Sequence, residues 1–275
     1  MYKEAAKIIN DADALFITAG AGIGVDSGLP DFRGNSGFWR AYPALKGLSF
    51  AEMANQEWFE KDPSKAWGFY GHRLNLYRET IPHKGFSIML EWLNKKNNPS
   101  FVFTSNVDGQ FQKAGFDKNQ ICECHGSIHH VQEDNDYGKI MSAKDINIEI
   151  DEETIRAKSL PSHPLLNGMI RPNILMFNDW NWNPRRTNNQ EIKMQKWKIN
   201  AKNKKIAIIE IGAGTAIPSV RWQSECMLEE NQNASLIRIN PRESWIPSQR
   251  AISIKKSGLE ALEGIKNELL RNITI

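Results

Sequence analysis

The sequence contains only three cysteines in 275 residues, and none of its apolar runs is long. So few thiols make a disulfide scaffold implausible, and we expect a reducing compartment, the cytoplasm. A membrane-spanning helix needs about 20 apolar residues in a row, and no such run occurs. The first residues carry acids ahead of a short apolar run, which is unlike a signal peptide. Membrane association is therefore not expected.

The chain also has little excess of positive over negative charge. The formal net charge is +3, and Lys and Arg form no continuous tract. Nucleic-acid binding usually shows as a clustered basic patch, so no nucleic-acid partner is expected. Hydrophobic residues make up 40% and charged residues 24% of the chain, which is typical of a globular protein of enzyme size. The oligomeric state is left open.

Short apolar runs recur along the chain and end in small or polar residues. They do not alternate between apolar and polar positions, which is typical of strands buried on both faces of a parallel sheet. Helical patterns separate them, for example at Pro82–Lys96 and Leu259–Leu270. The sequence therefore predicts an α/β fold, a Rossmann-like parallel sheet flanked by helices. The expected strands are Ala14–Thr18, Phe101–Thr104, Ile174–Phe177, Ile206–Ile211, Ser235–Ile239 and Ala251–Ile254.

The carboxyl ends of five of these runs are polar and rich in glycine. They read AGAG, SNVD, NDW, GAGT and INPRE in chain order. Ligands of parallel α/β sheets bind beyond the carboxyl ends of the strands, so we expect a ligand there. Residues 126–170, with their acids and weak apolar pattern, are expected to be an insertion outside the sheet, a smaller domain.

The first strand end, Gly20-Ala21-Gly22-Ile23-Gly24, has two possible explanations. Glycines there let backbone N–H groups approach a pyrophosphate closely. The alternative is a tight structural turn, and the glycines alone do not separate the two. A hydride-transfer enzyme is disfavoured, because Val25 stands where the dehydrogenase fingerprint has its third glycine. An acidic strand end about 20 residues later is missing as well.

Six blocks, in order between about residues 20 and 255, resemble the sirtuins, the NAD-dependent protein deacylases. The first runs from the glycine loop through Ser27-Gly28-Leu29-Pro30-Asp31-Phe32-Arg33-Gly34, with Gly24 where the family has serine. The others are Thr104-Ser105-Asn106-Val107-Asp108, His125-Gly126, Arg171-Pro172-Asn173 running to Phe177-Asn178-Asp179, Gly212-Ala213-Gly214-Thr215, and Ile239-Asn240.

The resemblance implies a single catalytic domain over residues 1–275 with NAD as co-substrate. Its large, NAD-binding part would comprise about 1–40, 82–125 and 172–275, and its smaller part about 41–81 and 126–171. The cofactor-binding residues implied by the family blocks are Gly20, Ala21, Gly22, Asp31, Phe32, Arg33, Ser105, Asn106, Asp108, Gly212, Thr215 and Asn240. The glycine loop would hold the pyrophosphate, and Asp31, Phe32 and Arg33 would shape the nicotinamide pocket. Ser105 replaces the family's common Gln.

His125 is the catalytic residue that the resemblance implies. Sirtuins cleave the bond between nicotinamide and ribose, and the acyl oxygen of a modified lysine captures the ribose carbon. A general base must then activate a ribose hydroxyl, and histidine suits that task near neutral pH. Without the family block, a histidine that follows two nearby cysteines, Cys122 and Cys124, is more often structural.

Tyr70 and Arg73 resemble the Tyr-x-x-Arg signature of sirtuins that remove succinyl and malonyl groups. A spacing of three places both side chains on one face of a helix, where a guanidinium and a phenol can grip a carboxylate. The same pair is also common on helices without such a role. Phe177, in the family's peptide-binding strand, is the third substrate-binding residue that the resemblance implies. The expected partner is an acylated protein or peptide lysine.

The sequence departs from the family at its structural zinc. Sirtuins usually carry two C-x-x-C pairs between the HG and RPN blocks, and this chain has neither. The ligand positions fall near Glu133, Asp136, Ser162 and Leu165, a set that does not make a sulfur-rich tetrahedral site. We therefore expect no zinc; a site built from His129, His130 and His163 is a weaker alternative.

Two other functions stay open beside the deacylase. The absent zinc ligands, and Asn178-Asp179 in place of Gly-Glu, suit an NAD glycohydrolase or ADP-ribosyltransferase, in which water or a protein side chain replaces the acyl oxygen. A non-enzymatic NAD or nucleotide sensor would require a broken catalytic set. Asp31, Asn106, Asp108 and His125 are all present, which argues against a sensor.

Overall fold

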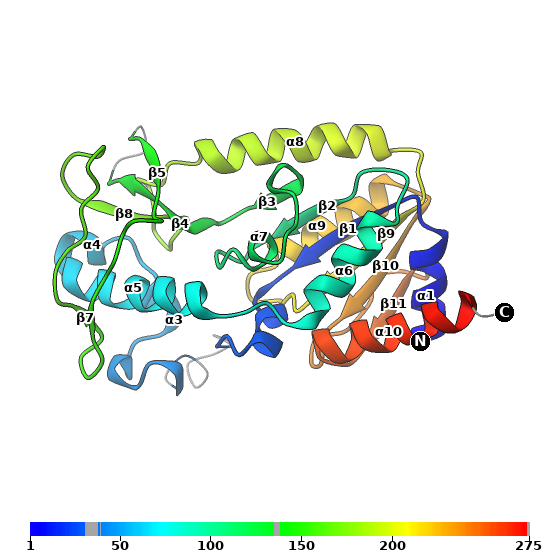
Figure 1. The fold of residues 1–275 in the computed structure, drawn as a ribbon, viewed down its shortest axis with the longest axis horizontal. Coiled ribbons are helices and arrows are strands. Elements are labelled where there is room, and N and C mark those ends of the chain that lie inside the picture. Colours follow the sequence, from blue (N-terminus) through cyan, green and yellow to red (C-terminus); the bar gives the residue numbers. More distant parts are fainter. Residues whose placement is uncertain (31–37, 39, 135–137, 274–275) are drawn as a thin grey trace.

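The computed structural model describes residues 1–30, 38, 40–134 and 138–273. The largest element is a sheet of six parallel strands in the order β11-β10-β9-β1-β2-β3 (Figure 1). The strands are β1 (Ala14–Ala19), β2 (Phe101–Thr104), β3 (Ile121–Glu123), β9 (Ile206–Ile211), β10 (Ala234–Ile239) and β11 (Ala251–Ile254). The Rossmann-like parallel sheet is therefore confirmed, and the strand order reverses between β1 and β9, as in the dinucleotide-binding folds.

Helices cover both faces of this sheet. This explains why apolar and polar residues do not alternate along its strands. One face packs against α1 (Tyr2–Asp11), α6 (Lys84–Asn94) and α10 (Gly258–Ile273), and the other against α8 (Arg185–Ala201) and α9 (Ser219–Glu230). Within β1, Leu15 and Ile17 face the first group and Phe16 the second. All three are fully buried. The expected helices at 82–96 and 259–270 are α6 and α10.

Two features of the sheet differ from the expectation. β3, a strand of only three residues, was not predicted. The strand expected at Ile174–Phe177 is wrong: the observed strand β8 (Ile170–Ile174) pairs antiparallel with β4 (Gly126–Glu133), outside the six-stranded sheet. The reason is one-sided burial, since Ile174 and Met176 are buried whereas Leu175 and Phe177 are exposed.

A second hydrophobic core lies at the other end of the molecule. It is built by α3 (Phe50–Met53), α4 (Trp58–Lys61) and α5 (Pro63–Glu79) against the sheet β5-β4-β8, in which β5 is Ile140–Ser142. The hairpin of β6 (Ile150–Asp151) and β7 (Arg156–Ala157) packs on α5. Residues 126–170 thus lie outside the six-stranded sheet, as expected. Short elements complete the chain: α7 (Gln110–Lys113) and the 3-10 helices η1 (Ala21–Ser27), η2 (Pro43–Leu45) and η3 (Lys118–Gln120).

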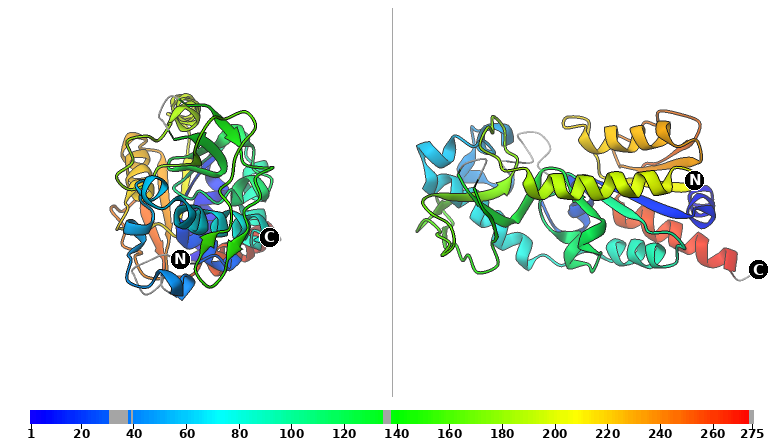
Figure 2. Two further views of the ribbon diagram at one scale, coloured as in Figure 1. Left: turned by 90° about the vertical axis from the view of Figure 1, so that its left-hand side faces the viewer. Right: turned by 90° about the horizontal axis from the view of Figure 1, so that it is seen from above.

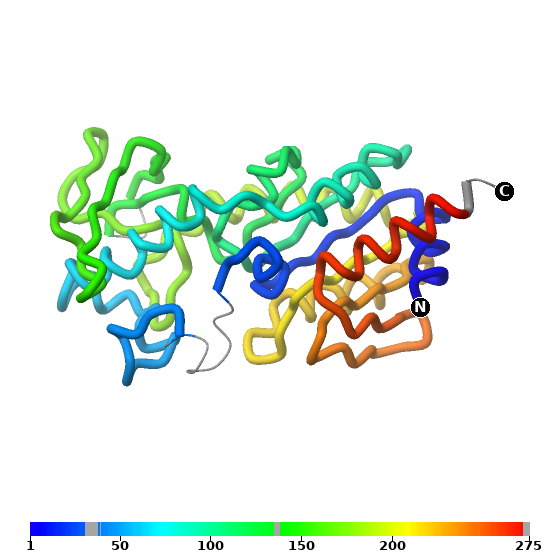
Figure 3. The backbone as a smooth tube through the Cα atoms, turned by 60° about the horizontal axis from the view of Figure 1, so that its bottom comes forward, coloured from blue at the N-terminus to red at the C-terminus, as the bar shows by residue number. Residues whose placement is uncertain are grey.

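The molecule is elongated, with the large sheet at one end and the second core at the other (Figures 1 and 2). Helix α8 runs lengthwise from the second core along the sheet, and both termini lie at the far end of the sheet (Figure 3). Among the described helices, none is long and apolar enough to cross a bilayer.

Candidate functional site

Two glycine-containing loops meet where the strand order reverses. Gly20 follows β1, Gly212 follows β9, and these strands are neighbours in the sheet. The Gly22 amide donates to the Gly212 carbonyl over 3.1 Å, and the Gly20 amide donates to the Ile211 carbonyl over 3.0 Å. The predicted phosphate loop therefore lies at the switch point of the sheet, where such folds bind dinucleotides.

The contact between these loops explains why both need glycine. A Cβ on Gly20 would lie 2.8 Å from the Gly212 carbonyl oxygen, and one on Gly22 would lie 2.7 Å from the Gly212 Cα. Gly212 itself has φ +64°, and a Cβ there would lie 2.4 Å from the Ile23 nitrogen. The glycines are therefore required by the structure, as a tight turn would require them. Phosphate binding is compatible with this, because Ala21 on the same loop is exposed at the sheet edge.

Asn106 and Asp108 follow β2 and are both buried. The Asn106 side-chain amide donates to the Gly20 carbonyl over 3.2 Å, which ties this segment to the glycine loop. The Asp108 carboxylate accepts from the Gln110 amide over 2.9 Å. Burial raises the pKa of Asp108 to about 6, against this hydrogen bond, which lowers it. Ser105, half-buried, donates its amide to the Ala19 carbonyl over 3.2 Å.

His125 lies just beyond β3, in the turn to β4. Its half-buried ring has Nε2 3.5 Å from the Ser219 hydroxyl at the start of α9. Burial lowers its pKa, and a hydrogen bond with the Ser105 backbone opposes that shift. Gly126 makes the turn possible, since it has φ +80° and a Cβ would lie 2.1 Å from the Asn173 carbonyl oxygen. Burial therefore favours the neutral imidazole, and the bond with Ser105 places it beside the segment that contains Asn106.

Thr215 and Asn240 mark the other side of the switch point. Asn240 is buried, and its side-chain amide donates to the Ala213 carbonyl over 2.7 Å. The side-chain oxygen Oδ1 of Asn240 accepts from the Glu243 backbone amide over 2.9 Å. The exposed Thr215 donates to the Glu243 carboxylate over 2.5 Å. The loops after β9 and β10 therefore form one hydrogen-bonded unit, and Glu243, which the sequence reading missed, is a member of it.

The comparisons with known proteins agree with this geometry. The model of the Sir2 family matches residues 20–200. The chain belongs to the Sir2 family. A NAD-dependent protein deacetylase of Saccharolobus solfataricus is 32% identical to this Sir2-family chain, over 65% of the chain and 66% of that protein. A NAD-dependent protein deacylase of Pyrococcus furiosus is 33% identical over the same shares. Each match thus spans slightly less than two thirds of the relative's length.

The fold is also that of solved Sir2 structures. A Sir2 homologue in complex with NAD superposes with a TM-score of 0.70 and 21% identity, covering 98% of this chain and 94% of that one. Residues 212–240 lie beyond the range that the Sir2 family model matches. Asp31, Phe32 and Arg33, in the family's most specific block, lie outside the described residues.

Tyr70 and Arg73 of this Sir2-family chain lie inside the second core, on α5. Both are buried, and the Arg73 guanidinium lies 5.7 Å from the Tyr70 ring, on the same helical face. Its Nε and Nη2 donate to the hydroxyl of Tyr77 over 3.1 and 2.9 Å. Tyr77, which the sequence reading missed, is four residues on and so faces the same side. The positive charge of Arg73 opposes part of the rise in the pKa of Asp108 that burial causes, so this cluster acts on a residue of the segment after β2.

Phe177 is exposed and forms an isolated parallel bridge with Asn55, next to the second core. Its amide donates to the Ala54 carbonyl over 2.9 Å, and its ring meets that of Phe50 edge to face. The next two residues differ from the family pattern for a structural reason. Asn178 adopts φ +52°, and Asp179 forms a fully buried, two-point ion pair with Arg171.

The positions of the family's zinc ligands do not suit a metal here. The Glu133 carboxylate accepts from the amides of Lys139 (3.2 Å) and Asn167 (3.1 Å), so it joins the two segments that zinc would join. Leu165 is exposed and cannot ligate, and Asp136 lies outside the described residues. His129 is bonded to the Asp108 carbonyl instead (2.8 Å). In the part of the chain that the structure describes, no three His, Cys, Asp or Glu side chains could hold a metal ion.

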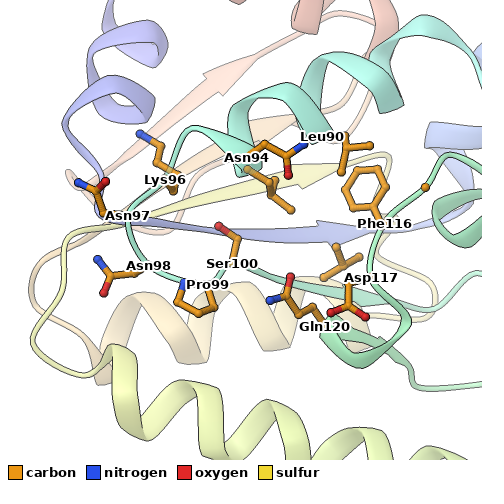
Figure 4. Close-up of a pocket in the computed structure, with 13 residues that line it drawn as sticks. Leu90, Asn94, Lys96, Asn97, Asn98, Pro99, Ser100, Phe116, Asp117 and Gln120 are labelled. Carbon is orange, nitrogen blue, oxygen red and sulfur yellow. The ribbon is translucent and has the colours of Figure 1, made fainter.

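A pocket of about 470 Å³ lies at the opposite, amino-terminal edge of the sheet (Figure 4). Leu90 and Phe116 line it together with Asn94 and Gln120. Ser100 at its floor accepts from the Leu15 amide over 2.9 Å, which fixes the start of β1. None of the predicted site residues lines this pocket, so it is separate from the site at the carboxyl edge.

Proposed function

We propose that the protein is a NAD-dependent protein-lysine deacylase that forms nicotinamide and O-acyl-ADP-ribose. One observation carries this proposal: Asn106 bonds the glycine loop at the switch point, and His125 bonds the backbone of Ser105 beside it. The names of the Saccharolobus and Pyrococcus relatives support it. NAD as co-substrate and the expectation that the protein holds no zinc both belong to this proposal.

Different residues at the carboxyl edge of the sheet would bind different parts of NAD. Gly20, Ala21 and Gly22 would approach the pyrophosphate, with Gly212, Thr215 and Asn240 on the adenosine side. Asn106, Asp108 and Ser105 would orient the nicotinamide ribose, and Asp31, Phe32 and Arg33 would enclose the nicotinamide. NAD supplies the glycosidic bond that breaks when the acyl oxygen takes the ribose carbon.

The protein's own step is a proton transfer at His125. Its lowered pKa keeps the imidazole neutral at pH 7, so it can accept a proton from a ribose hydroxyl. We propose that Tyr70 and Arg73 bind an acidic acyl group, because burial strengthens a charge-assisted contact to a carboxylate. Phe177 would border the lysine chain, between the large NAD-binding part and the smaller part of the domain.

The hydrolase alternative rests on the changed peptide-binding strand. Asp179 is committed to Arg171 rather than to a substrate, which weakens the analogy with the family's Gly-Glu. An NAD glycohydrolase or ADP-ribosyltransferase would keep the NAD site and dispense with the peptide. A cytoplasmic location, and the lack of nucleic-acid or membrane partners, stay predictions from composition.

The test is incubation with NAD and an acyl-lysine peptide, followed by mass spectrometry of the products. Formation of acyl-ADP-ribose together with deacylated peptide is the expected result. Nicotinamide and ADP-ribose without loss of the acyl group would support the alternative.

A further inference from the structure

A buried charged group lies between α9 and the large sheet. Arg238 on β10 is fully buried, and its neighbour in register on β9 is Glu210, also buried. The two form a two-point ion pair, with Nε–Oε1 and Nη2–Oε2 distances of 2.6 and 2.9 Å. Glu225 on α9 adds a third contact, 2.7 Å from Nη2. Figure 1 shows these elements side by side at the right of the molecule.

Such a group is not needed to hold the sheet together. Removing charges from water costs free energy that the ion pair only partly offsets, and apolar side chains of similar volume often serve equally well. Neighbouring positions on the same face of the sheet carry no charge: Phe16, Ile208 and Leu236 are apolar, and Thr18 is an uncharged polar residue. The position of Arg238 therefore calls for a contact that an apolar side chain could not make.

That contact is to the loop after β10. Arg238 Nη1 donates to the Trp245 carbonyl over 2.6 Å, five residues beyond Asn240. A second arginine, Arg221 on α9, donates to the Ala213 carbonyl over 3.3 Å and also to the Glu243 carbonyl. Two mostly buried guanidinium groups thus hold the backbone of residues 213 and 243–245, the loops that contain Thr215 and Asn240.

We propose that Arg238 is a positioning residue that presets these loops for the adenosine half of NAD. The proposal rests on the proposed function, because it assigns the loops to the NAD site. Glu210 and Glu225 orient the guanidinium so that Nη1 points at the Trp245 carbonyl, and Asn240 is fixed between the two held segments. A loop already ordered in the free protein loses less conformational entropy when the ligand binds.

The experiment is calorimetric titration of NAD into the wild type and the Glu210→Leu/Arg238→Met variant. The double substitution removes both buried charges together, so no unpaired ion remains in the core, and Glu225 can turn to solvent. We expect NAD affinity to fall about three- to tenfold, the effect of losing one loop hydrogen bond. KM for NAD should rise by the same factor while kcat stays within about twofold.

The matched control is Ser224→Ala. Ser224 lies on α9 in the same buried layer and bonds Thr18 on β1 (2.7 Å), but it does not hold the loop. Its loss should lower the unfolding temperature without changing NAD affinity. If the double variant does not fold, Arg238→Lys, which keeps a cation but not the fork, should show the same weakening.

Equal affinities in wild type and Arg238 variants would overturn the inference, as would equal weakening by Ser224→Ala. A wild-type protein that does not bind NAD would instead contradict the proposed function. The two failures are therefore distinguishable in one set of titrations.

Discussion

Gly22 and Gly212 lie almost 200 residues apart in the chain, yet the amide of one donates to the carbonyl of the other over 3.1 Å, and neither has room for a Cβ. The contact joins the carboxyl ends of β1 and β9 at the switch point of the sheet. Because the two loops approach so closely, main-chain groups of both lie at the position where a dinucleotide is expected to bind.

Gly212→Ala should therefore damage the site severely. The new Cβ would meet the Ile23 nitrogen at 2.4 Å, and φ +64° adds strain for any L side chain. The matched control is Gly168→Ala, which has a similar φ of +70° but open space around its Cβ. We expect Gly168→Ala to cost about 1–2 kcal/mol of stability, and Gly212→Ala to cost more and to abolish NAD binding. Equal effects in chemical unfolding would contradict the importance of the loop contact.

The sequence sufficed for the sheet but not for all of its strands. Five expected strands were correct because helices bury both faces and the apolar runs do not alternate. The run at 174–177 is also apolar, but it is buried on one face only. Of its residues, only Ile174 belongs to a strand, β8 of the second sheet, and the run itself does not indicate this. β3 was missed because it is only three residues long and includes the charged Glu123. Glu123 forms an ion pair with Arg186 on α8, which is far away in the sequence.

Strand ends predict only part of the candidate site, and the family blocks imply the rest, such as His125, Tyr70 and Arg73. Asn106, Asp108 and Gly212 come directly after β2 and β9, and their convergence follows from a parallel sheet. The contact of Arg73 with Tyr77 follows from their spacing of four on one helix, which the sequence shows. The bond of Arg238 to the Trp245 carbonyl is tertiary, and no local pattern indicates it.

Asp108 should make stability depend on pH. Its pKa is about 6 when folded, against 3.8 as the ordinary value, so folding favours the protonated form. Its stabilising effect is present below about pH 4 and is lost as the pH rises to about 6 and beyond. At pH 8, the free energy of unfolding of Asp108→Asn, measured with urea, should therefore exceed that of the wild type by about 2–3 kcal/mol. At pH 4 the two proteins should be equally stable.

A control of opposite sign is available in Asp62. Its contact with Arg156 lowers its pKa, so its contribution to stability is present above pH 4 and disappears in acid. Asp62→Asn should lose stability at pH 8 where Asp108→Asn gains it. Two variants that shift in the same direction would contradict the assignment for Asp108.

Arg73→Met should lower activity on succinyl-lysine while sparing acetyl-lysine. Only the succinyl group offers a carboxylate to the guanidinium, and such a contact is worth about 1.5–3 kcal/mol, roughly ten- to a hundredfold in kcat/KM. Tyr77→Phe removes the hydroxyl that accepts from Arg73 but leaves the charge of Arg73 in place. This variant should lose less activity on succinyl-lysine than Arg73→Met does. Equal losses on both peptides would assign Arg73 to the fold instead.

The purified protein should hold no stoichiometric zinc and should keep its unfolding temperature in a chelator. Glu133 already bonds the two segments that a structural zinc would join. A structural zinc contributes its binding free energy to folding, so its removal would unfold the domain. One zinc per chain by elemental analysis would show this prediction to be wrong.

The coupling of nicotinamide release to the acyl peptide tests the central claim most directly. Wild type and His125→Ala would be incubated with NAD, with and without acyl-lysine peptide, and nicotinamide and acyl-ADP-ribose would be quantified. The account predicts release that depends on the peptide, equal amounts of the two products, and about 10²–10⁴-fold less acyl-ADP-ribose from His125→Ala at nearly unchanged NAD affinity. Nicotinamide release by the wild type that needs no peptide, or full turnover by His125→Ala, would contradict it.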